Sequence, residues 1–523
     1  MMRLLLLVFV FFLSLNSINA QSKDRKVLIN KAEAKFKTGN YDEALDDYLQ
    51  LVIDEPKNPE FNYNLGVCYL NSNGVKSKAV PYLEIVVRSE NPNPKAEYLL
   101  GRAYQYANRF DDALNYFEKY KSKAKKDDPL LKEVELEIQH CINGKEITKY
   151  PIDVSFQNLG KNINSGFADY YPFVTENESF MVYNSKRPYT ANTPKLYNGQ
   201  YANSIYISKV VKGDYVESDI IGKPICEPNS GEEVIGMNAT GDILVIYKTN
   251  IKGEGKIYIS RTTPLGTYSK LEALPDVINE TGEVISACIN NDASTIYFAS
   301  YKTDGFGGTD LYSCNKLPTG KWSKAMNMGS EINTKYDEDF PNLSPDGKTF
   351  YFSSKGHSSM GGYDIFKASF DDETKVFGKP LNIGYPVNSS YDDLNFRISK
   401  NGRYGYVASL RGEGLGDFDI YRVTFNSIEI ENSVFIGNIF PKDSAQKVDY
   451  KSTYLTISNN SSGETVGNYV PNPQTGRFII ILPPGKYTLL CEAPDFKEYK
   501  QPLEVLDKIS YQPEINIYIE LKN

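Results

Sequence analysis

The sequence predicts a multidomain α plus β protein, with an N-terminal α-helical solenoid, a five-bladed β-propeller and a C-terminal β-sandwich. A short phrase returns five times, with markers at positions 160, 222, 275, 329 and 384, and strand-forming residues fill the intervals. Ahead of these copies, small residues recur in a helical pattern at positions 32, 66 and 101. Periods of these two lengths are typical of radial β architectures and of helical repeat arrays, respectively.

The first 20 residues are expected to be a signal peptide. Arg3 gives a basic start, an apolar run extends from Leu4 to Leu15, and a stretch of small and polar residues ends at Ala20. The run is too short to span a bilayer. No cysteine lies beside the expected cleavage site, so a lipid anchor is not expected. We therefore expect an exported chain that starts near Gln21 and lies in the periplasm or at the outer membrane.

Residues 21–146 resemble a tetratricopeptide repeat (TPR) array. Ala32, Gly66 and Gly101 fall at equivalent positions of three helical hairpins, where small side chains let two helices approach closely. A further helix is expected from about Pro129 to Cys141, with apolar residues for one face. We expect this helix to cap the array.

The concave side of the array is the candidate surface for a protein partner. Its first-helix positions in repeats two and three are Tyr63, Val67, Asn71, Tyr98, Arg102 and Gln105. Tyrosine and arginine are frequent anchors of protein interfaces. The alternative is that these residues are ordinary surface or pack between repeats.

Residues 150–426 are expected to form the propeller, with four strands in each blade. In the fourth copy, Ser344-Pro345-Asp346-Gly347 predicts a tight turn, because proline fixes φ and glycine accepts a positive φ. The fifth copy ends after its third strand, near Phe425. We expect residues 152–157, ahead of the first copy, to supply the missing strand and close the ring.

Acidic residues recur near the start of the blades, and two interpretations are open. They are Asp169, Glu232, Glu233, Glu283, Glu338, Asp339, Asp392 and Asp393. A ring of carboxylates at the central channel could bind a cation. The favoured interpretation is that they accept hydrogen bonds from turns or are solvated. Asp310, Asp364 and Asp419 follow Gly-rich loops, where a carboxylate can accept backbone N–H bonds, so we expect a structural role.

The composition gives little support for a catalytic, metal or cofactor site. The net charge of −8 argues against a nucleic-acid partner or an anionic membrane surface. Six scattered cysteines are expected to be buried free thiols rather than disulfides. The two histidines, His140 and His357, lack a second ligand at metal-site spacing, and no CxxC motif occurs. We expect no catalytic residue, metal or cofactor.

The stretch from Gly356 to Gly362 is the one segment that could suggest a serine nucleophile. A nucleophile elbow needs G-x-S-x-G on a strand-to-helix turn. Here the second glycine comes one residue late, and the stretch lies between two expected strands of one blade. We interpret it as a loop, which makes a hydrolase the weakest of the functional hypotheses.

Residues 428–523 are expected to form a small antiparallel sandwich, because alternating apolar strands are separated by turn residues. The stretch from Asn472 to Leu489 resembles the carboxypeptidase regulatory-like (transthyretin-like) module. That resemblance implies a structural accessory rather than a peptidase.

The order of these parts resembles the PorE-type envelope proteins of Bacteroidota, which are associated with type IX secretion and gliding. The propeller resembles the TolB-like class, with WD40-like repeats. The resemblance implies a non-enzymatic scaffold whose partner is an outer-membrane barrel or a secretion component. Those proteins generally carry an OmpA-like domain and often a lipid anchor; we expect neither here, so peptidoglycan binding is not expected. The alternative function is a glycan or peptide receptor that uses the propeller face.

Overall fold

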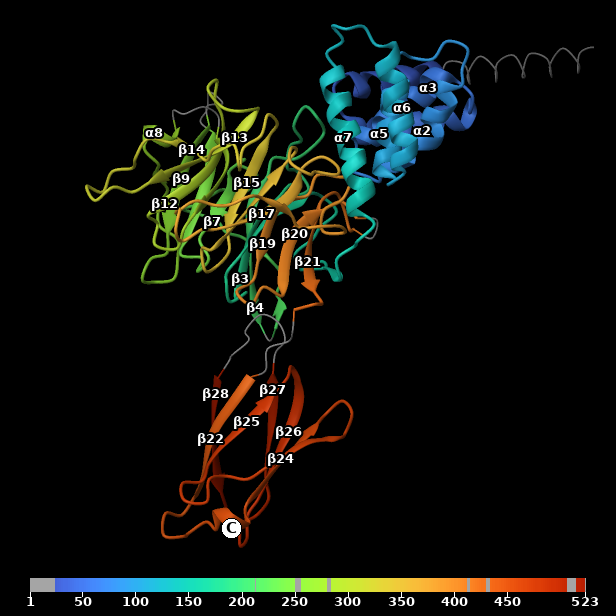
Figure 1. Ribbon diagram of the computed structural model, residues 1–523. Helices are drawn as coiled ribbons and strands as arrows, with labels where there is room; N and C mark the ends of the chain where they lie inside the picture. Colours follow the sequence, from blue (N-terminus) through green and yellow to red (C-terminus); the bar gives the residue numbers. More distant parts are fainter. Residues whose placement is uncertain are drawn as a thin grey trace, which may run out of the picture.

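The computed structural model has a helical unit, a large β region and a smaller β unit along the chain (Figure 1). It describes residues 24–211, 213–249, 255–279, 284–411, 414–428, 433–505 and 514–522. The expected signal peptide and the expected start of the exported chain lie outside these residues. Within them, no helix has the length and apolar character that crossing a membrane would require.

The helical unit consists of antiparallel helix pairs. Its helices cover residues 24–37, α2 (Tyr41–Asp54), α3 (Pro59–Asn71), η1 (Lys76–Ala79), α4 (Val80–Val87), α5 (Ala96–Tyr106), α6 (Phe110–Lys123) and α7 (Leu131–Ile147). Local sequence fixes the start of α3, where the Asn58 side chain accepts the N–H groups of Glu60 and Phe61 and Pro59 occupies the first turn.

Glycines set the spacing between these helices. A Cβ atom at Gly66 would lie 2.6 Å from Leu83, and one at Gly101 would lie 2.7 Å from Phe117. Gly144 on α7 faces the preceding helix instead, and a Cβ atom there would lie 2.6 Å from Phe110 on α6. α7 contacts both α6 and α5, as α5 contacts both α4 and α3, so it packs as the next first helix of the array would.

Within residues 154–425, the described strands form five antiparallel sheets. The first contains β2 (Asp169–Val174), β3 (Phe180–Ser185), β4 (Ser204–Val211), β5 (Asp214–Tyr215) and β6 (Asp219–Ile220); the second contains β7 (Glu233–Met237), β8 (Ile243–Thr249), β9 (Gly255–Arg261) and β10 (Glu272–Ala273), followed by the one-turn helix α8 (Asp276–Asn279). The third contains β11 (Val284–Ile289), β12 (Thr295–Tyr301), β13 (Thr309–Asn315) and β14 (Met326–Asn327); the fourth contains β15 (Glu338–Leu343), β16 (Thr349–Ser354), β17 (Asp364–Ser369) and β18 (Leu381–Asn382).

The fifth sheet joins the two ends of this region. It contains β19 (Leu394–Ile398), β20 (Tyr404–Ser409), β21 (Asp419–Phe425) and, from the other end, β1 (Val154–Asn158). β1 pairs with β21 from Val154 opposite Phe425 to Asn158 opposite Tyr421, the pairing that the sequence predicts. The first strands of the sheets contact one another in the cyclic order β2, β7, β11, β15, β19 and back to β2. We refer to this closed cycle as the ring.

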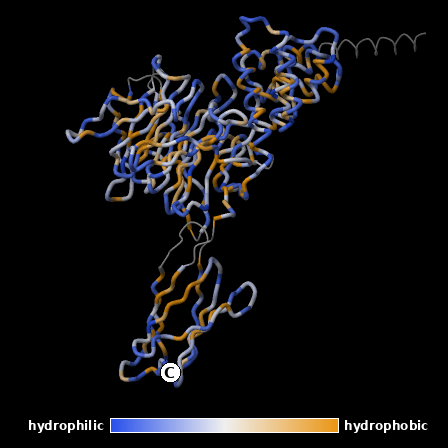
Figure 2. The backbone as a smooth tube through the Cα atoms, in the orientation of Figure 1, coloured by the Kyte–Doolittle hydropathy of each residue, from blue (hydrophilic) through white to orange (hydrophobic). Residues whose placement is uncertain are grey.

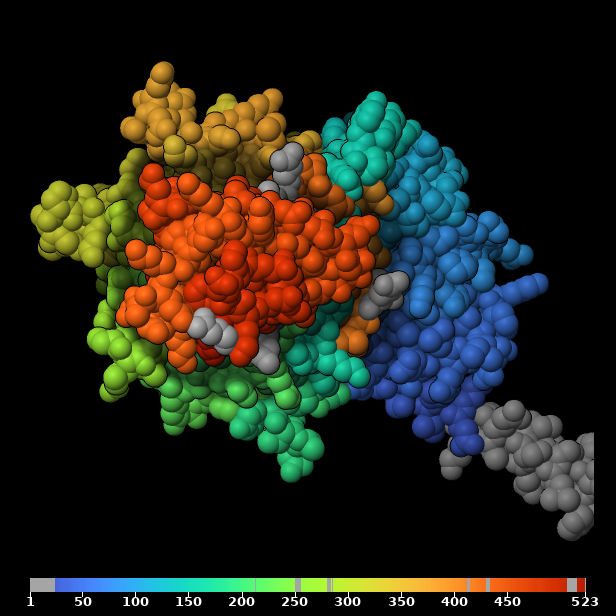
Figure 3. Space-filling model, turned by 90° about the horizontal axis from the view of Figure 1, so that it is seen from below, coloured from blue at the N-terminus to red at the C-terminus, as the bar shows by residue number. Residues whose placement is uncertain are grey.

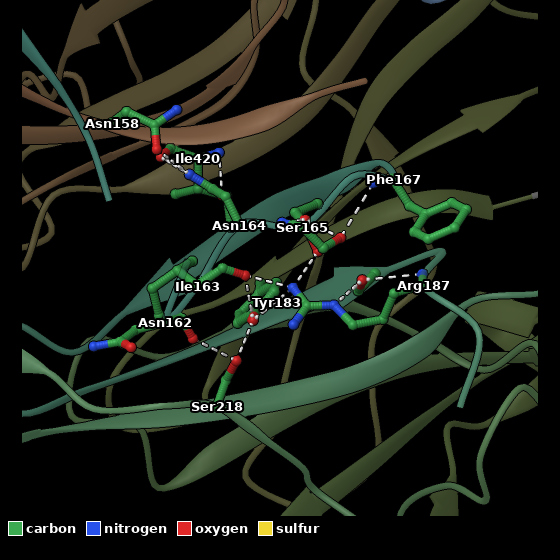
Figure 4. A network of polar contacts seen from close by, with 12 residues as sticks. Asn158, Asn162, Ile163, Asn164, Ser165, Phe167, Tyr183, Arg187, Ser218 and Ile420 are labelled. Carbon is green, nitrogen blue, oxygen red and sulfur yellow. Dashed lines mark hydrogen bonds and ion pairs between the residues drawn. The ribbon is translucent and has the colours of Figure 1, made fainter. Parts of the chain in front are cut away.

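An Asn in four of the five copies of the repeated phrase fastens a sheet to the segment that follows it. The Asn164 side chain accepts the N–H of Ile420 at 2.8 Å and donates to its carbonyl at 2.9 Å, as a neighbouring strand would (Figure 4). Asn279, Asn333 and Asn388 bind Ile257, Leu311 and Ile365 in the same two-bond manner. The first copy therefore binds the last sheet, which reinforces the closure made by β1 and β21.

The C-terminal unit has two sheets around one apolar core. One sheet contains β25 (Arg477–Leu482), β22 (Ser433–Pro441) and β28 (Glu514–Leu521); the other contains β24 (Thr465–Tyr469), β23 (Tyr454–Asn459), β26 (Gly485–Glu492) and β27 (Tyr499–Val505), and η2 (Tyr450–Ser452) precedes β23. β22 and β28 run parallel, which corrects the expectation of an antiparallel unit. The chain passes through the second sheet between them, and such a crossover permits parallel neighbours.

Apolar residues follow the strands of both β regions, and polar residues occupy most of the loops (Figure 2). In β22, buried residues alternate with less buried ones, so one face of the strand meets the core. Viewed from below, the C-terminal unit (orange to red) lies in front of the ring and the helical unit (blue) lies at its side (Figure 3).

Candidate functional site

The candidate partner-binding residues fall into two groups. On α3, Tyr63 and Val67 are half-buried and Asn71 is exposed. They follow one another at four-residue spacing, so they share one helix face. This part of the candidate surface is accessible.

The other three candidates, on α5, are covered by α7. The Tyr98 hydroxyl donates to Glu133, Arg102 pairs with Glu137 at 3.0 Å, and Gln105 donates to Glu137 at 2.7 Å. Tyr98, Arg102 and Gln105 therefore do not line an open groove. The alternative interpretation, packing between repeats, describes them, because α7 occupies the place of the next repeat.

Glu137 is the centre of this buried cluster. Burial raises the pKa of its carboxyl, but the Arg102 guanidinium and then His140 and Gln105 outweigh burial and lower it to about 2. Glu137 is therefore ionised at neutral pH and fully partnered inside the helical unit.

The same cluster continues into the ring. His140 lies between Glu137, at 3.2 Å from Nδ1, and the carbonyl of Lys355, at 2.8 Å from Nε2. The Asn143 side chain donates to the carbonyl of Ser359 at 2.8 Å. Met360, from the same ring loop, is completely buried in the apolar core of the helical unit. We call the contact of α7 with residues 355–360 the joint.

Further contacts widen the joint. Ser390 donates to Asn108 at 2.6 Å, and the rings of Tyr106 and Tyr391 lie 4.8 Å apart. The sequence predicts that α7 caps the helical array, but it gives no sign of the joint. The residues that meet in the joint are more than 200 positions apart in the sequence. The Gly356–Gly362 stretch is a loop between β16 and β17, as expected, and it serves as the ring's half of the joint.

The acids near the start of the sheets accept hydrogen bonds from nearby turns. Asp169, Glu338 and Asp393 each accept the backbone N–H and the hydroxyl of a Ser or Thr four residues earlier, which are Ser165, Thr334 and Ser389. Glu232 forms an ion pair with Lys248 and accepts a hydrogen bond from Ser230. Glu233 accepts a hydrogen bond from Tyr170, and Asp339 accepts one from Ser286. Asp392 accepts the N–H of Tyr363. Glu283 lies outside the described residues. Among those described, no group of three or more metal-ligating side chains converges.

Burial changes the acid strength of several of these groups. It raises the pKa of Glu338, Asp339 and Asp393 to about 7, because their hydrogen-bond partners stabilise the charged form less than water would. All three lie at the end of the ring where the helical unit is attached.

The other candidate structural residues stabilise loops. Asp310 accepts the N–H groups of Phe306 and Gly307, Asp364 accepts that of Met360, and Asp419 accepts that of Leu415. Each also binds an Asn of the repeated phrase, which is Asn327, Asn382 or Asn158. Asp346 accepts from Ser344 and from the N–H of Lys348, and Gly347 has a φ of 72°.

The opposite end of the ring contains a cavity of about 330 Å³. Each inner strand contributes one residue at the equivalent position, and these residues are Phe173, Met237, Cys288, Asn342 and Arg397. The turns after these strands form its rim. The Ile428 carbonyl accepts from Arg403 in the turn between β19 and β20, so the chain leaves the ring at this end toward the C-terminal unit. We call this space the ring cavity.

Arg397 is not among the residues that the sequence predicts as functional. Asp393 and Arg397 are four residues apart, as are Asp169 and Phe173, and Glu338 and Asn342. This common spacing from the acids marks Arg397 as an inward position. The six cysteines are buried free thiols, and β12 separates Cys288 on β11 from Cys314 on β13.

Comparisons with known proteins bear mainly on the helical unit. The TPR repeat family matches residues 32–73. No curated protein matches the chain in sequence.

Solved structures of low similarity cover about half of this chain. A glycoside hydrolase has a TM-score of 0.34 and 8% identity and covers 54% of this chain and 94% of its own. A levansucrase of B. subtilis has a TM-score of 0.34 and 9% identity, with coverage of 56% and 92%. A β-xylosidase/α-arabinofuranosidase from a compost microbial metagenome has a TM-score of 0.32 and 12% identity, with coverage of 52% and 94%. At these TM-scores the likenesses carry no argument about fold or function.

Proposed function

We propose that this protein is a non-enzymatic scaffold of a cell-envelope complex. In this proposal, the TPR unit recruits a protein partner, a five-bladed β-propeller serves as a rigid platform, and the C-terminal unit is a carboxypeptidase regulatory-like sandwich. The observation that carries the proposal is the joint. It inserts Met360 of the ring into the helical core and binds His140 and Asn143 to ring carbonyls. A buried, hydrogen-bonded joint holds a recruiting surface at a fixed place on the platform.

The recruiting surface is the accessible face of α3. TPR arrays bind proteins along such faces, and Tyr63 can supply the aromatic anchor that interfaces favour. Val67 and Asn71 extend this face by two turns of the helix. The covered candidates on α5 contribute to rigidity rather than to recognition.

The cellular setting of the proposal comes from the order of domains. That order resembles the PorE-type envelope proteins, which supports an exported protein in the periplasm or at the outer membrane, within type IX secretion or gliding machinery. The proposed partner is an outer-membrane barrel or a secretion component.

Photo-crosslinking in the native host tests this function. We would place benzoylphenylalanine at position 67, on the proposed face, and at the exposed position 54 at the end of α2 as the matched control. The proposal expects one envelope protein to crosslink through position 67 and not through position 54. Equal crosslinking at both positions, or none at position 67, would contradict it.

A second candidate function is a glycan or peptide receptor, and the ring cavity is the observation that favours it. Cavities lined by apolar and a few polar groups are the usual form of ligand sites. Glycan and peptide arrays probed with the whole protein would test this function. Binding that disappears when Arg397 is replaced would support it, and a blank array would count against it.

A further inference from the structure

The ring cavity has a cation at one inward position and no anion at the other four. Phe173, Met237, Cys288 and Asn342 accompany Arg397, which is 5% exposed. A buried guanidinium without a counter-charge costs several kcal/mol in desolvation. In the wall of a cavity, such a group is a candidate for binding an anion from outside the chain.

The contacts of Arg397 are few. Nη1 donates to the carbonyl of Phe396 at a long 3.4 Å, and the guanidinium carbon lies 4.3 Å from the centre of the Phe173 ring. Nε has no hydrogen-bond partner, and no ion pair to Arg397 occurs among the residues that the structure describes. Burial lowers the pKa of Arg397 to about 9, with Cys288 as the one opposing influence.

Four other arginines also have an Nε without a partner, but each has a better bond elsewhere. Arg102 forms an ion pair with Glu137, and Arg403 donates to the Ile428 carbonyl. Arg411 donates to the Pro386 carbonyl at 2.9 Å, and Arg422 donates to Gln157 at 2.5 Å. Arg397 thus stands apart through the combination of deep burial, one long bond and a place on a cavity wall.

The rim of the cavity selects against multiply charged anions. Glu176, Asp292 and Asp346 lie there. At the surface, Glu176 forms an ion pair with Lys400. Asp292 accepts the N–H of Ser294, and Asp346 accepts the N–H of Lys348. Their negative charges repel a polyanion more strongly than a monoanion.

We propose that the ring cavity binds a carboxylate monoanion with a small apolar body, and that Arg397 is its charge partner. The planar guanidinium matches the two oxygens of a carboxylate. Phe173, Met237 and Leu343 provide apolar wall for the rest of the molecule. The proposal is independent of the scaffold role, which uses α3, and it makes the receptor role specific by naming the ligand class.

The test is fluorine NMR of 4-fluorobenzoate titrated with the full chain in chloride buffer of constant ionic strength. We expect binding with a Kd of about 1 mM, as one buried charge pair plus a ring contact provides. Arg397→Met should weaken binding at least about tenfold. Arg422→Met is the matched control, because it removes another buried arginine outside the cavity, and it should bind as the wild type does. Arg397→Lys keeps the charge without the planar fork and should bind with intermediate affinity, so the test survives if Arg397→Met fails to fold.

Competition identifies the source of the carboxylate. Displacement of 4-fluorobenzoate by Gly-Gly-Phe but not by its C-terminal amide would assign the group to a peptide end, and displacement by neither would assign it to a free acid. Displacement by inorganic phosphate at equal concentration would overturn the preference for a monoanion. No binding to the wild type, or unchanged binding to Arg397→Met, would overturn the site itself. Glycan binding on an array without 4-fluorobenzoate binding would overturn this inference and leave the receptor role in place.

Discussion

Glu137 in the helical unit and Arg397 in the ring are both buried charges, with exposed fractions of 6% and 5%. Glu137 has Arg102, Gln105 and His140 around it, and its pKa falls to about 2. Arg397 has one long hydrogen bond and an aromatic ring, and its pKa falls to about 9. Both shifts are downward, but for an acid this means a stabilised charge and for a base a destabilised one.

The difference separates architecture from a candidate site. A partnered buried charge is costly to break and therefore holds elements together. An unpartnered one lowers stability until a ligand arrives. The first lies at the joint, and the second lies at the opposite end of the ring.

The largest effect is expected for Arg102→Met, which leaves Glu137 buried without its cation. We expect the free energy of unfolding to fall by about 4 kcal/mol, because an unpaired buried carboxylate is strongly destabilising. Urea unfolding followed by circular dichroism at the helical signal measures this. The control is Arg88, which is 73% exposed and pairs with the partly buried Glu84, and Arg88→Met should cost about 0.5 kcal/mol or less. Equal costs for the two variants would break the comparison.

The joint should depend on apolar packing as well as on Glu137. Met360→Ala removes a completely buried side chain from the helical core and should cost about 3 kcal/mol. Calorimetry should then resolve the helical unit and the ring as separate transitions where the wild type shows a coupled one. Met326→Ala, at a methionine that is 60% exposed, is the control. A single unshifted transition in Met360→Ala would argue against a structural joint.

Asp339 lies between the cases of Glu137 and Arg397. Its buried carboxyl accepts hydrogen bonds only from neutral donors, which are Ser286 and the N–H of Phe340. Burial raises its pKa to about 7, and Asp337 adds to this while Lys355 opposes it. The folded state therefore holds the proton more tightly, and the stability that this contributes at acidic pH is lost as pH rises from about 4 to about 7. Asp339→Asn mimics the protonated form, so we expect it to stabilise the protein at pH 8 and to leave its stability nearly unchanged at pH 4. Denaturant unfolding at both pH values measures this, and the same difference at both would contradict the assignment.

The smallest effect is expected where charges are exposed. Lys195 of the ring and Glu43 of the helical unit lie 3.1 Å apart, and both side chains are nearly half exposed. Lys195→Ala should change the free energy of unfolding by about 0.3 kcal/mol. Chemical denaturation in low and high salt checks this value, and a cost near that of Arg102→Met would show that burial does not decide the outcome.

Periodicity carries most of what could be predicted about this fold. Repeat spacing locates the strands, and the incomplete last copy points to the pairing of β1 with β21. The parallel neighbours β22 and β28 could not be predicted, because they are about 80 residues apart and alternation within a strand does not reveal its neighbour.

The candidate site was only partly predictable for a related reason. The sequence puts Tyr98, Arg102 and Gln105 on one helix face, but it cannot show that α7 covers that face. The spacing of the repeats does predict that Arg397 lies at an inward position of its strand. Its lack of a counter-charge depends on five strands from different copies, which only the folded ring brings together.

The most direct test of the difference between the two charges is the sign of their effects on stability. In chloride buffer without any carboxylate ligand, Arg397→Met should raise the free energy of unfolding by about 1 kcal/mol, because it removes an uncompensated buried charge. Arg102→Met should lower it in the same experiment. If Arg397→Met lowers the free energy of unfolding as Arg102→Met does, then Arg397 is structural and the distinction between the two regions is wrong.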